Sequence, residues 1–445
     1  MQELPPVDVA PLPANPFPHC ARRATTRHAR PLVLPSITVG NVKLPAHHAR
    51  AEAASELAGL AVQWLLGATD SDWDDYSLYH GRSGILLAMH EAAEMAGGHV
   101  LDDTIQSGLD RLTEEVERVD DCSLYFGLAG MAFTLNSLGR EDAAHRALRR
   151  VRDRTESGRW GPMFELLAGN AGIGLGALRV GDLELAIHAV TPYLSTWSKT
   201  PNGVNWPVRP TPPRSHHIAH GTLGIVFALA AVGDAAGRPD LLELAVEGAM
   251  DVLARNQAGP DGFLVPHSDP PHRPDIIERF SLGWCNGPAG DTQVFRLLER
   301  ITQEKQWASW GDRCWQTVVS SGLPERVRPG FWDNNGRCCG TAGVLALACD
   351  RIVERGDGFG FADLLYDDLA SRASIDEDGA RWSNHEHRNT PPDLTPRSGW
   401  AMGNAGIVRE LLRYSRLCRG SSDGAYSVWW PDHPSTLTSP VRGAR

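Results

Sequence analysis

The sequence predicts an all-α fold in which seven helix-turn-helix repeats close into an (α/α) toroid. Three observations support this fold class. A short glycine phrase with a GxxG core occurs seven times, the copies lie about 42 to 66 residues apart, and apolar residues recur at intervals of three and four around most copies. Recurrence at this spacing is typical of repeat architectures, and the shorter periodicity is that of helices.

The seven phrases mark the predicted turns. They lie at residues 80–84, 124–130, 165–172, 219–224, 284–290, 337–343 and 400–406, and the fifth and sixth read WCNGPAG and RCCGTAG. Glycine has no Cβ, so a helix that starts in such a phrase can approach a neighbouring backbone closely. We therefore expect all seven phrases at one end of the toroid.

Helical patterns stand on both sides of the phrases. Apolar runs without proline follow them from Ile85, Met131, Ile225, Val344 and Ile407, and further helical segments precede them, for example at residues 51–66 and 241–256. Each repeat is therefore predicted to contain a pair of helices. The proline-rich segments 201–215 and 266–275 are predicted loops just upstream of the fourth and fifth phrases.

We assign residues 46–420 to the repeats. Residues 1–45 combine many prolines with a run of arginines and hold too little apolar surface to fold alone, so they are predicted to form a flexible arm. Residues 421–445 are assigned to a C-terminal tail.

Composition narrows the function classes. The formal net charge is −11 and 22% of residues are charged, which gives no broad attraction to phosphate backbones, so nucleic acid is not an expected partner. Without a long apolar stretch or a secretory signal, the chain is expected to be cytoplasmic, with no membrane insertion. In a reducing compartment its eight cysteines indicate metal ligands or buried small residues rather than disulfides.

Three of these cysteines lie in the phrases. Cys285 stands in the fifth phrase, and Cys338 and Cys339 precede the first glycine of the sixth. Zinc takes four tetrahedral ligands, and a catalytic site keeps one position open, so three protein ligands are what an enzyme needs. The alternatives are three small buried residues beside glycine turns, or a closed structural site completed by a fourth cysteine or histidine.

The seven phrases in register, with thiols only in the fifth and sixth, resemble those of the lanthionine synthetase C family, the LanC cyclases. The resemblance covers nearly all of the chain from about residue 50. It implies an (α/α)7 double toroid that carries one zinc ion and joins a peptide cysteine to dehydroalanine or dehydrobutyrine, making thioether rings. Close relatives, the LanC-like proteins, can add glutathione to dehydroamino acids.

The sixth phrase departs from the pattern of many LanC cyclases, which carry histidine where this chain has Cys339. Zinc with three thiolates has a net charge of about −1. We expect such a site to hold an incoming substrate thiolate less tightly and to leave it more nucleophilic. On this hypothesis, Cys339→His lowers the single-turnover rate of thiol addition.

Proton handling is expected to rest on His220. Attack of sulfur on a dehydroamino acid generates an enolate, which needs an acid at the α-carbon, and imidazole titrates in the right range. The resemblance matches His220 to the family's active-site histidine. Glu165 occupies the place of an aspartate in the third phrase and retains a carboxylate that can orient His220.

Other positions also differ from the pattern of the LanC cyclases. The arginine that well-studied cyclases place four residues before the fifth-phrase cysteine is Ser281 here, and Arg279 is the predicted replacement. Asn286 follows that cysteine and cannot transfer a proton. We interpret His216 and His217 as polar loop residues, and the run at residues 384–388 as a polar rim or a carboxylate-binding segment.

The predicted function is therefore zinc-dependent formation of thioether rings in a dehydrated precursor peptide, with dehydration performed by a separate dehydratase. One alternative is a LanC-like protein that adds glutathione or another small thiol to electrophiles. Another is a zinc-bearing toroid that binds a peptide without turnover. A toroid that acts on sugars is disfavoured, because no phrase presents the paired carboxylates of glycoside hydrolysis.

Overall fold

The computed structural model describes residues 46–69, 71–96, 101–272, 274–275, 277–325, 334–384 and 395–434. The chain divides into two units, residues 1–31 and 32–445, and every described residue belongs to the second. The predicted arm at residues 1–45 lies outside the described residues, as do His385 and His387 of the proposed polar rim.

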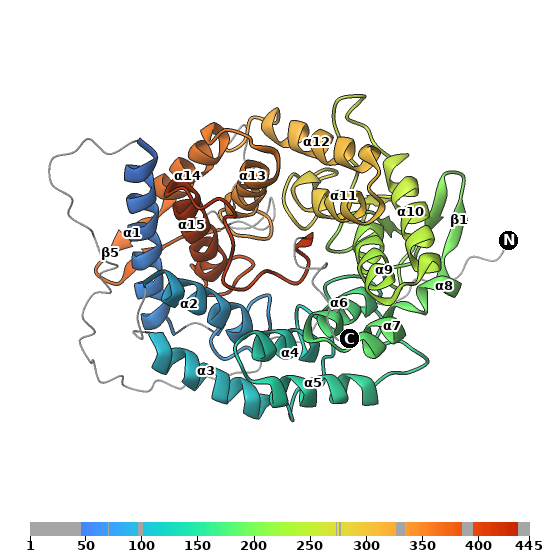
Figure 1. Ribbon diagram of the computed structural model, residues 1–445, viewed down its shortest axis with the longest axis horizontal. Coiled ribbons are helices and arrows are strands. Elements are labelled where there is room, and N and C mark those ends of the chain that lie inside the picture. Colours follow the sequence, from blue (N-terminus) through green and yellow to red (C-terminus); the bar gives the residue numbers. More distant parts are fainter. Residues whose placement is uncertain are drawn as a thin grey trace, which may run out of the picture. The chain divides into compact units, whose positions relative to one another are not determined.

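An inner ring of helices forms the centre of the second unit (Figure 1). Each inner helix packs against the next, and the last packs against the first. These helices are α2 (Arg82–Ala96), α4 (Leu128–Ser137), α6 (Asn170–Val180), α9 (Thr222–Ala236), α11 (Pro288–Thr302), α13 (Thr341–Arg355) and α15 (Asn404–Cys418). Helices that are apolar all round belong in a protein interior, and α9 fits this rule because every residue from Thr222 to Gly233 is buried.

A second set of helices surrounds the first (Figure 1). It comprises α1 (Ala46–Gly67), α3 (Asp102–Glu115), α5 (Glu141–Asp153), α7 (Leu183–Val190), α10 (Pro239–Leu253), α12 (Lys305–Val319) and α14 (Gly360–Arg372), with the short α8 (Tyr193–Thr196) after α7. Six of them pack on the inner helix that precedes them in sequence, whereas α1 packs on α15 and closes the ring. The predicted all-α fold of paired helices is confirmed.

The glycine phrases start the inner helices. The first glycine of each of the last six phrases is the N-cap of its helix, and the second lies in the first turn. A Cβ on Gly290 would lie 1.8 Å from the carbonyl oxygen of Trp284, and the second glycine of every phrase makes the equivalent approach to the residue six positions earlier. Any side chain at these positions would therefore collide with backbone.

Backbone hydrogen bonds join the phrases to one another. In six of the seven phrases, the residue two positions before the first glycine donates its N–H to the carbonyl of its counterpart in the next phrase, at 2.9 to 3.2 Å. The links run Tyr79 to Tyr125, Tyr125 to Leu167, Ala219 to Cys285, Cys285 to Cys338, Cys338 to Ala401 and Ala401 to Tyr79. Within the described chain, the link from Leu167 to Ala219 is missing, so this circle has one gap, between the third and fourth phrases.

Three short antiparallel hairpins or ladders complete the described secondary structure. β1 (Ser198–Thr200) pairs with β2 (Gly203–Asn205), and β5 (Ser374–Asp376) with β6 (Gly379–Arg381). β3 (Arg214–Ser215) pairs with β4 (Ser268–Asp269). This last ladder joins the two proline-rich loops beside the fourth and fifth phrases.

Residues 421–434 pack back onto the inner helices. Trp430 stacks on Trp400 with ring centroids 4.3 Å apart and donates its indole N–H to the Tyr125 hydroxyl at 3.0 Å. Asp432 accepts a hydrogen bond from the Trp284 indole at 2.8 Å. The C-terminal segment therefore contacts aromatic side chains of three phrases.

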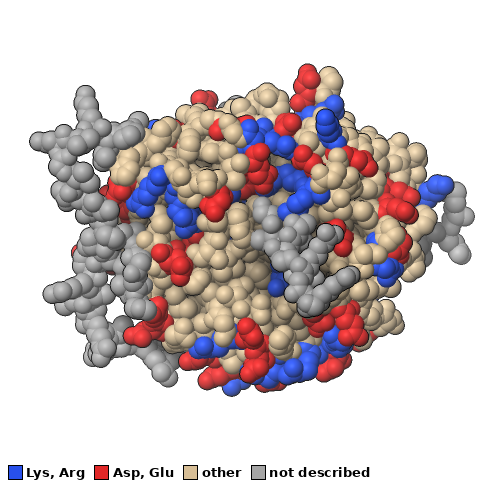
Figure 2. All heavy atoms as spheres, in the orientation of Figure 1, with Lys and Arg blue, Asp and Glu red and all other residues tan. Residues whose placement is uncertain are grey.

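Basic and acidic side chains intermix on the face shown in Figure 2. Charged side chains of neighbouring outer helices pair with one another, as Arg50 of α1 does with Asp367 of α14 at 2.6 Å and Arg152 of α5 with Glu184 of α7 at 3.0 Å. Exposed pairs of this kind each contribute about 0 to 1 kcal/mol. In the part of the chain that the structure describes, no helix combines the length and the apolar character needed to cross a membrane.

Candidate metal centre and acid-base site

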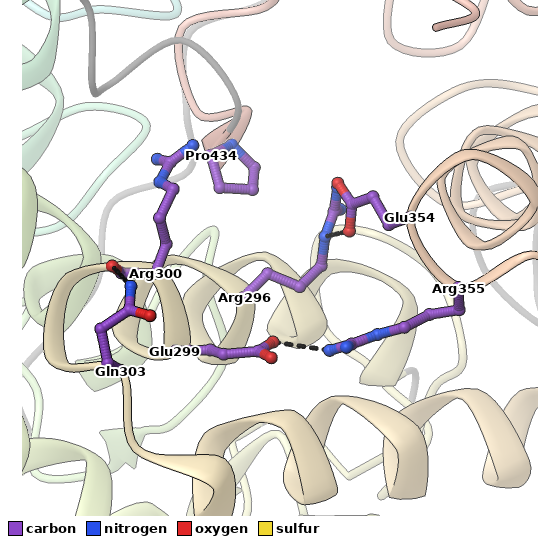
Figure 3. A pocket seen from close by; sticks show the side chains of 7 residues that line it. All are labelled: Arg296, Glu299, Arg300, Gln303, Glu354, Arg355 and Pro434. Atoms are coloured by element: carbon purple, nitrogen blue, oxygen red, sulfur yellow. Dashed lines mark hydrogen bonds and ion pairs between the residues drawn. The ribbon is translucent and has the colours of Figure 1, made fainter. Parts of the chain in front are cut away.

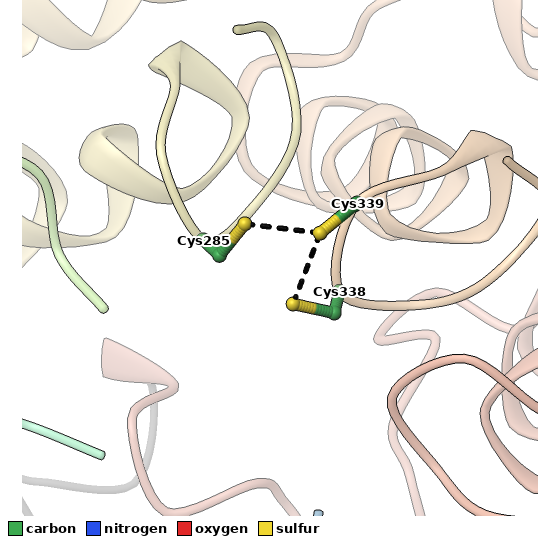
Figure 4. A group of neighbouring side chains, drawn as sticks. All are labelled: Cys285, Cys338 and Cys339. Carbon is green, nitrogen blue, oxygen red and sulfur yellow. Dashed lines mark hydrogen bonds between the residues drawn. The ribbon is translucent and has the colours of Figure 1, made fainter. Parts of the chain in front are cut away.

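The three phrase cysteines converge. The Sγ atoms of Cys285 and Cys339 lie 3.1 Å apart, those of Cys338 and Cys339 lie 3.4 Å apart, and all three lie within 4.8 Å of one another (Figure 4). The backbone sets this arrangement, because the N–H groups of Trp284 and Cys285 both donate to the Cys338 carbonyl, at 3.0 and 3.2 Å. The fifth and sixth phrases are thereby fixed in register.

The thiols differ in environment. Cys285 and Cys338 are buried and Cys339 is half-buried. The Tyr79 hydroxyl donates to Cys338 Sγ at 3.1 Å, and the Asn286 amide donates to Cys285 Sγ at 3.4 Å. Hydrogen bonding with Cys338 and then with Cys339 holds the pKa of the Cys285 thiol well below its usual range, while burial raises the pKa of Cys338 well above it. The group therefore favours one thiolate even without a cation.

This donor set fits zinc. A tetrahedral zinc with Zn–S bonds of about 2.3 Å holds its sulfur atoms about 3.8 Å apart, close to the observed spacing. Among the described residues, this is the one group of three His, Cys, Asp or Glu side chains whose ligand atoms lie within reach of a common ion. The other described cysteines, Cys122, Cys314, Cys349 and Cys418, are free buried thiols outside the group.

His220 and Glu165 come together at the gap in the backbone circle. His220 Nδ1 lies 3.4 Å from Glu165 Oε2, and the histidine side chain is 37% exposed whereas Glu165 is fully buried. The Glu165 carboxylate also accepts the N–H groups of Leu167 at 2.9 Å and Ala168 at 2.8 Å. The Leu167 donor, which would otherwise continue the circle of phrase-to-phrase bonds, is thus used to hold a carboxylate under the histidine.

Glu165 decides the protonation of His220. Burial lowers the pKa of the imidazole, but the hydrogen bond and the negative charge of Glu165 outweigh burial, so the pKa lies above its usual 6.5. The negative charge of Cys285 acts in the same direction. The raised pKa favours the protonated form of this half-buried histidine.

The described side-chain contacts of Arg279 lie outside this centre. Its exposed guanidinium donates to the Gln257 side chain at 3.2 Å and stands over the Phe280 ring, and none of its described contacts is with His220 or the thiols. The positive charge that acts on His220 instead belongs to Arg209. Arg209 is half-buried, donates to the Ser215 hydroxyl at 3.5 Å, and leaves its buried Nε without a partner among the described residues.

His216 and His217 lie in an irregular segment, which agrees with their interpretation as loop residues, but both are buried. His217 Nδ1 lies 2.6 Å from Asp291 Oδ2, and Asp291 Oδ1 accepts the Ile218 N–H at 3.0 Å. His267, from the second proline-rich loop, packs edge-on against His217. Asp291 directly follows the fifth phrase, so this pair fastens the fourth phrase to the start of α11. Sequence reasoning missed it since the partners are 74 residues apart.

Comparison with known proteins agrees with this geometry. Nisin cyclase superposes with a TM-score of 0.59 at 13% sequence identity, covering 86% of this chain and 96% of that one. An α-1,6-mannanase of Salegentibacter, also 13% identical, covers 83% and 99% with a TM-score of 0.47. A search of curated proteins found no match.

The similarity to nisin cyclase supports the toroid fold inferred from the helix packing. The family model described as lanthionine synthetase C-like protein matches residues 72–272 and 272–364, which is more than half of the chain. The matched residues include His220, Cys285, Cys338 and Cys339. The chain therefore belongs to the lanthionine synthetase C-like family.

Proposed function

We propose that this protein is a zinc-dependent cyclase that adds cysteine thiols of a dehydrated peptide to its dehydroalanine or dehydrobutyrine residues. The observation that carries the proposal is the convergence of three thiols beside an exposed, carboxylate-paired histidine. Addition forms one C–S bond and one C–H bond, and it moves the π electrons of the dehydroamino acid onto the α-carbon before protonation. The reaction therefore needs a nucleophilic sulfur and a proton donor on one surface.

Cys285, Cys338 and Cys339 would hold the zinc. They are the soft ligands that zinc prefers, and the half-buried Cys339 places the group at an accessible edge. When bound, zinc would lower the pKa of a thiol that reaches it and so supply a nucleophile at neutral pH.

His220 would protonate the α-carbon. Its raised pKa favours the charged form, and its partly exposed side chain would be within reach of a bound peptide. Glu165 would position the ring and would not touch the substrate, because its carboxylate is fully buried. Asn286, which follows Cys285, donates to that thiol and leaves His220 as the proposed acid.

Arg209 would stabilise the enolate oxygen in place of the arginine missing at Ser281. Its charge acts on His220, and its buried Nε has no partner among the described residues. A guanidinium near a developing negative charge is an effective electrostatic catalyst. This assignment replaces the predicted role of Arg279.

The test is to incubate the zinc-loaded protein with a dehydrated peptide that retains a free cysteine. Ring formation leaves the peptide mass unchanged and abolishes its alkylation by iodoacetamide. We expect Cys338→Ala to lose bound zinc and ring formation together, whereas Cys122→Ala, a buried thiol outside the group, keeps both. A mass increase with added glutathione would favour the small-thiol alternative, and an unchanged alkylatable peptide would leave only a binding role.

A further inference from the structure

A pocket lies between the C-terminal parts of the inner helices α11 and α13, toward the opposite ends of these helices from their glycine phrases. Its volume is about 270 Å³. Four lining residues come from α11 and its end, two from α13, and one from the C-terminal segment (Figure 3): Arg296, Glu299, Arg300, Gln303, Glu354, Arg355 and Pro434. None of these residues takes part in the thiol centre.

Most charges in the pocket are paired. Arg296 donates to both carboxylate oxygens of Glu354 and to Asp350 behind the pocket, the latter at 2.6 Å. Arg355 donates to Glu299 at 2.6 Å. Both glutamates are thus engaged, and three arginines against two glutamates leave the lining residues with an excess of one positive charge, which the nearby charge of Asp234 outside the lining opposes.

Arg300 supplies that excess. Its Nε and Nη2 are buried and have no hydrogen-bond partner in the described structure. Figure 3 shows its guanidinium extending toward Pro434, away from Gln303. Burial, together with the nearby charge of Arg296, lowers the pKa of this guanidinium from its usual value. A buried donor left without a hydrogen bond destabilises the folded protein, and more so when it is charged, so an anionic ligand would remove this penalty.

We propose that this pocket is a binding site for a small ligand bearing a phosphate or carboxylate group, which accepts hydrogen bonds from Nε and Nη2 of Arg300. The two adjacent donors of a guanidinium edge match two oxygens of either oxyanion. The cavity is larger than the anion alone needs, and the paired charges of Arg296 and Arg355 border the remaining space. This inference is independent of the thiol chemistry.

The experiment is calorimetric titration of inorganic phosphate, and separately of acetate, into the full-length protein at constant low ionic strength with chloride as the background anion. We expect saturable binding of at least one anion, weakened at least 10-fold in Arg300→Ala. Preference for phosphate would identify a phosphate-bearing ligand, and preference for acetate a carboxylate-bearing one.

Arg238→Ala is the matched control, since Arg238 is an exposed arginine paired with Asp240 outside the pocket. This control should bind the anion like the wild type. Arg300→Lys keeps the positive charge but loses the two adjacent donors of the guanidinium group, so it should bind the anion with intermediate affinity. Thermal unfolding of each variant establishes that it is folded. Absence of saturable binding by the wild type, or equal binding by a folded Arg300→Ala variant, would overturn the proposal.

Discussion

At the residue scale, Glu165 shows how one added methylene can be accommodated. The Glu165 carboxylate accepts hydrogen bonds from the N–H groups of Leu167 and Ala168, two and three residues later in the chain, and it still lies beside His220. Its oxygens are therefore fixed by backbone, and the histidine meets a carboxylate of defined position. Burial is the largest single effect on the pKa of the imidazole and lowers it, while the hydrogen bond and charge of that carboxylate, together with the charge of Cys285, bring the pKa above its usual value.

Glu165→Gln should move the pH dependence of the reaction. Without the negative charge, burial dominates and the pKa of His220 falls. Because the protonated histidine is the proposed acid, activity is lost as pH rises through this pKa, so the alkaline limb of the kcat profile should shift to lower pH. Glu165→Asp should restore part of the shift, and an unmoved alkaline limb would contradict the proposed pairing.

The pairing of His220 with Glu165 should also make the free energy of unfolding fall as pH rises. A histidine whose pKa is raised on folding contributes stability that is complete below the unfolded pKa of about 6.5 and is lost as pH rises through the folded pKa. The wild type should therefore lose its stability advantage over Glu165→Gln in alkaline solution.

Arg209→Ala should lower kcat by roughly 100-fold, the usual effect of removing one group that stabilises an oxyanion. Arg209→Lys should recover part of the rate because it keeps the charge. Arg279→Ala is the control and should retain nearly full kcat, since the Arg279 side chain contacts Gln257 and Phe280. A larger loss for Arg279→Ala than for Arg209→Ala would restore the role first predicted for Arg279.

Sequence reasoning succeeded at this scale where chemistry is local. Cys338 and Cys339 adjoin a helix start, and Cys285 holds nearly the same place in the preceding phrase, so repeat symmetry predicts their meeting. Arg209 and Asp291 have no such signal. The charge of Arg209 acts on His220 from an irregular proline-rich loop, and the partner of Asp291 is set by how the fourth phrase folds onto α11.

At the element scale, the phrase acts as a cap that needs no capping side chain. In the last six phrases the N-cap is an extended glycine, and no side chain accepts the first helical N–H groups. Backbone carbonyls of the preceding loop accept some of these N–H groups instead, as Asp121 does for Leu128 and Asn334 for Thr341. The second glycine leaves no room for a Cβ beside the carbonyl six residues earlier. The helix starts were predictable because every one of the seven phrases carries the glycine that this turn requires.

Gly290→Ala tests that requirement. Its Cβ would lie 1.8 Å from a backbone carbonyl oxygen, so we expect a loss of about 3 kcal/mol in the free energy of unfolding measured in urea. Gly311→Ala is the matched control inside α12, where the nearest atom would be 3.6 Å away. It should be neutral or stabilise by about 0.5 to 1 kcal/mol, as alanine does in a helix interior. Equal effects at the two sites would contradict the packing argument.

At the scale of the whole molecule, the number of repeats and their paired helices followed from periodicity, but the packing of residues 421–434 did not. That segment carries no phrase and no helical pattern, and its position depends on Trp430 meeting Trp400 and Asp432 meeting Trp284. Such contacts are visible only once the inner helices are in place.

Buried neutral histidines should make the molecule sensitive to acid. Burial lowers the pKa of His216 to about 3, of His267 to about 4 and of His433 to about 3. The unfolded chain binds these protons near pH 6.5 and the folded chain does not, so the free energy of unfolding should fall as pH falls from about 6.5 toward 4. The slope is about 1.4 kcal/mol per pH unit for each histidine.

His216→Phe should reduce that slope by one such increment, because neither ring nitrogen of His216 has a partner among the described residues. His145→Gln, at an exposed position, should leave the slope unchanged. Denaturation curves collected across this pH range provide the measurement. An unchanged slope in His216→Phe would show that this imidazole titrates freely in the folded protein.

The packing of α1 on α15 is expected to slow folding. Ser55 and Ser415, which are hydrogen-bonded across this interface, are 360 positions apart. During synthesis α1 is made first, and its apolar side stays without its partner α15 until the other repeats have been translated. Contacts between residues so distant in sequence also form slowly. A circular permutant that begins at α2 and ends with α1 would turn this last docking event into the closing of a local hairpin, and it should refold faster than the natural order.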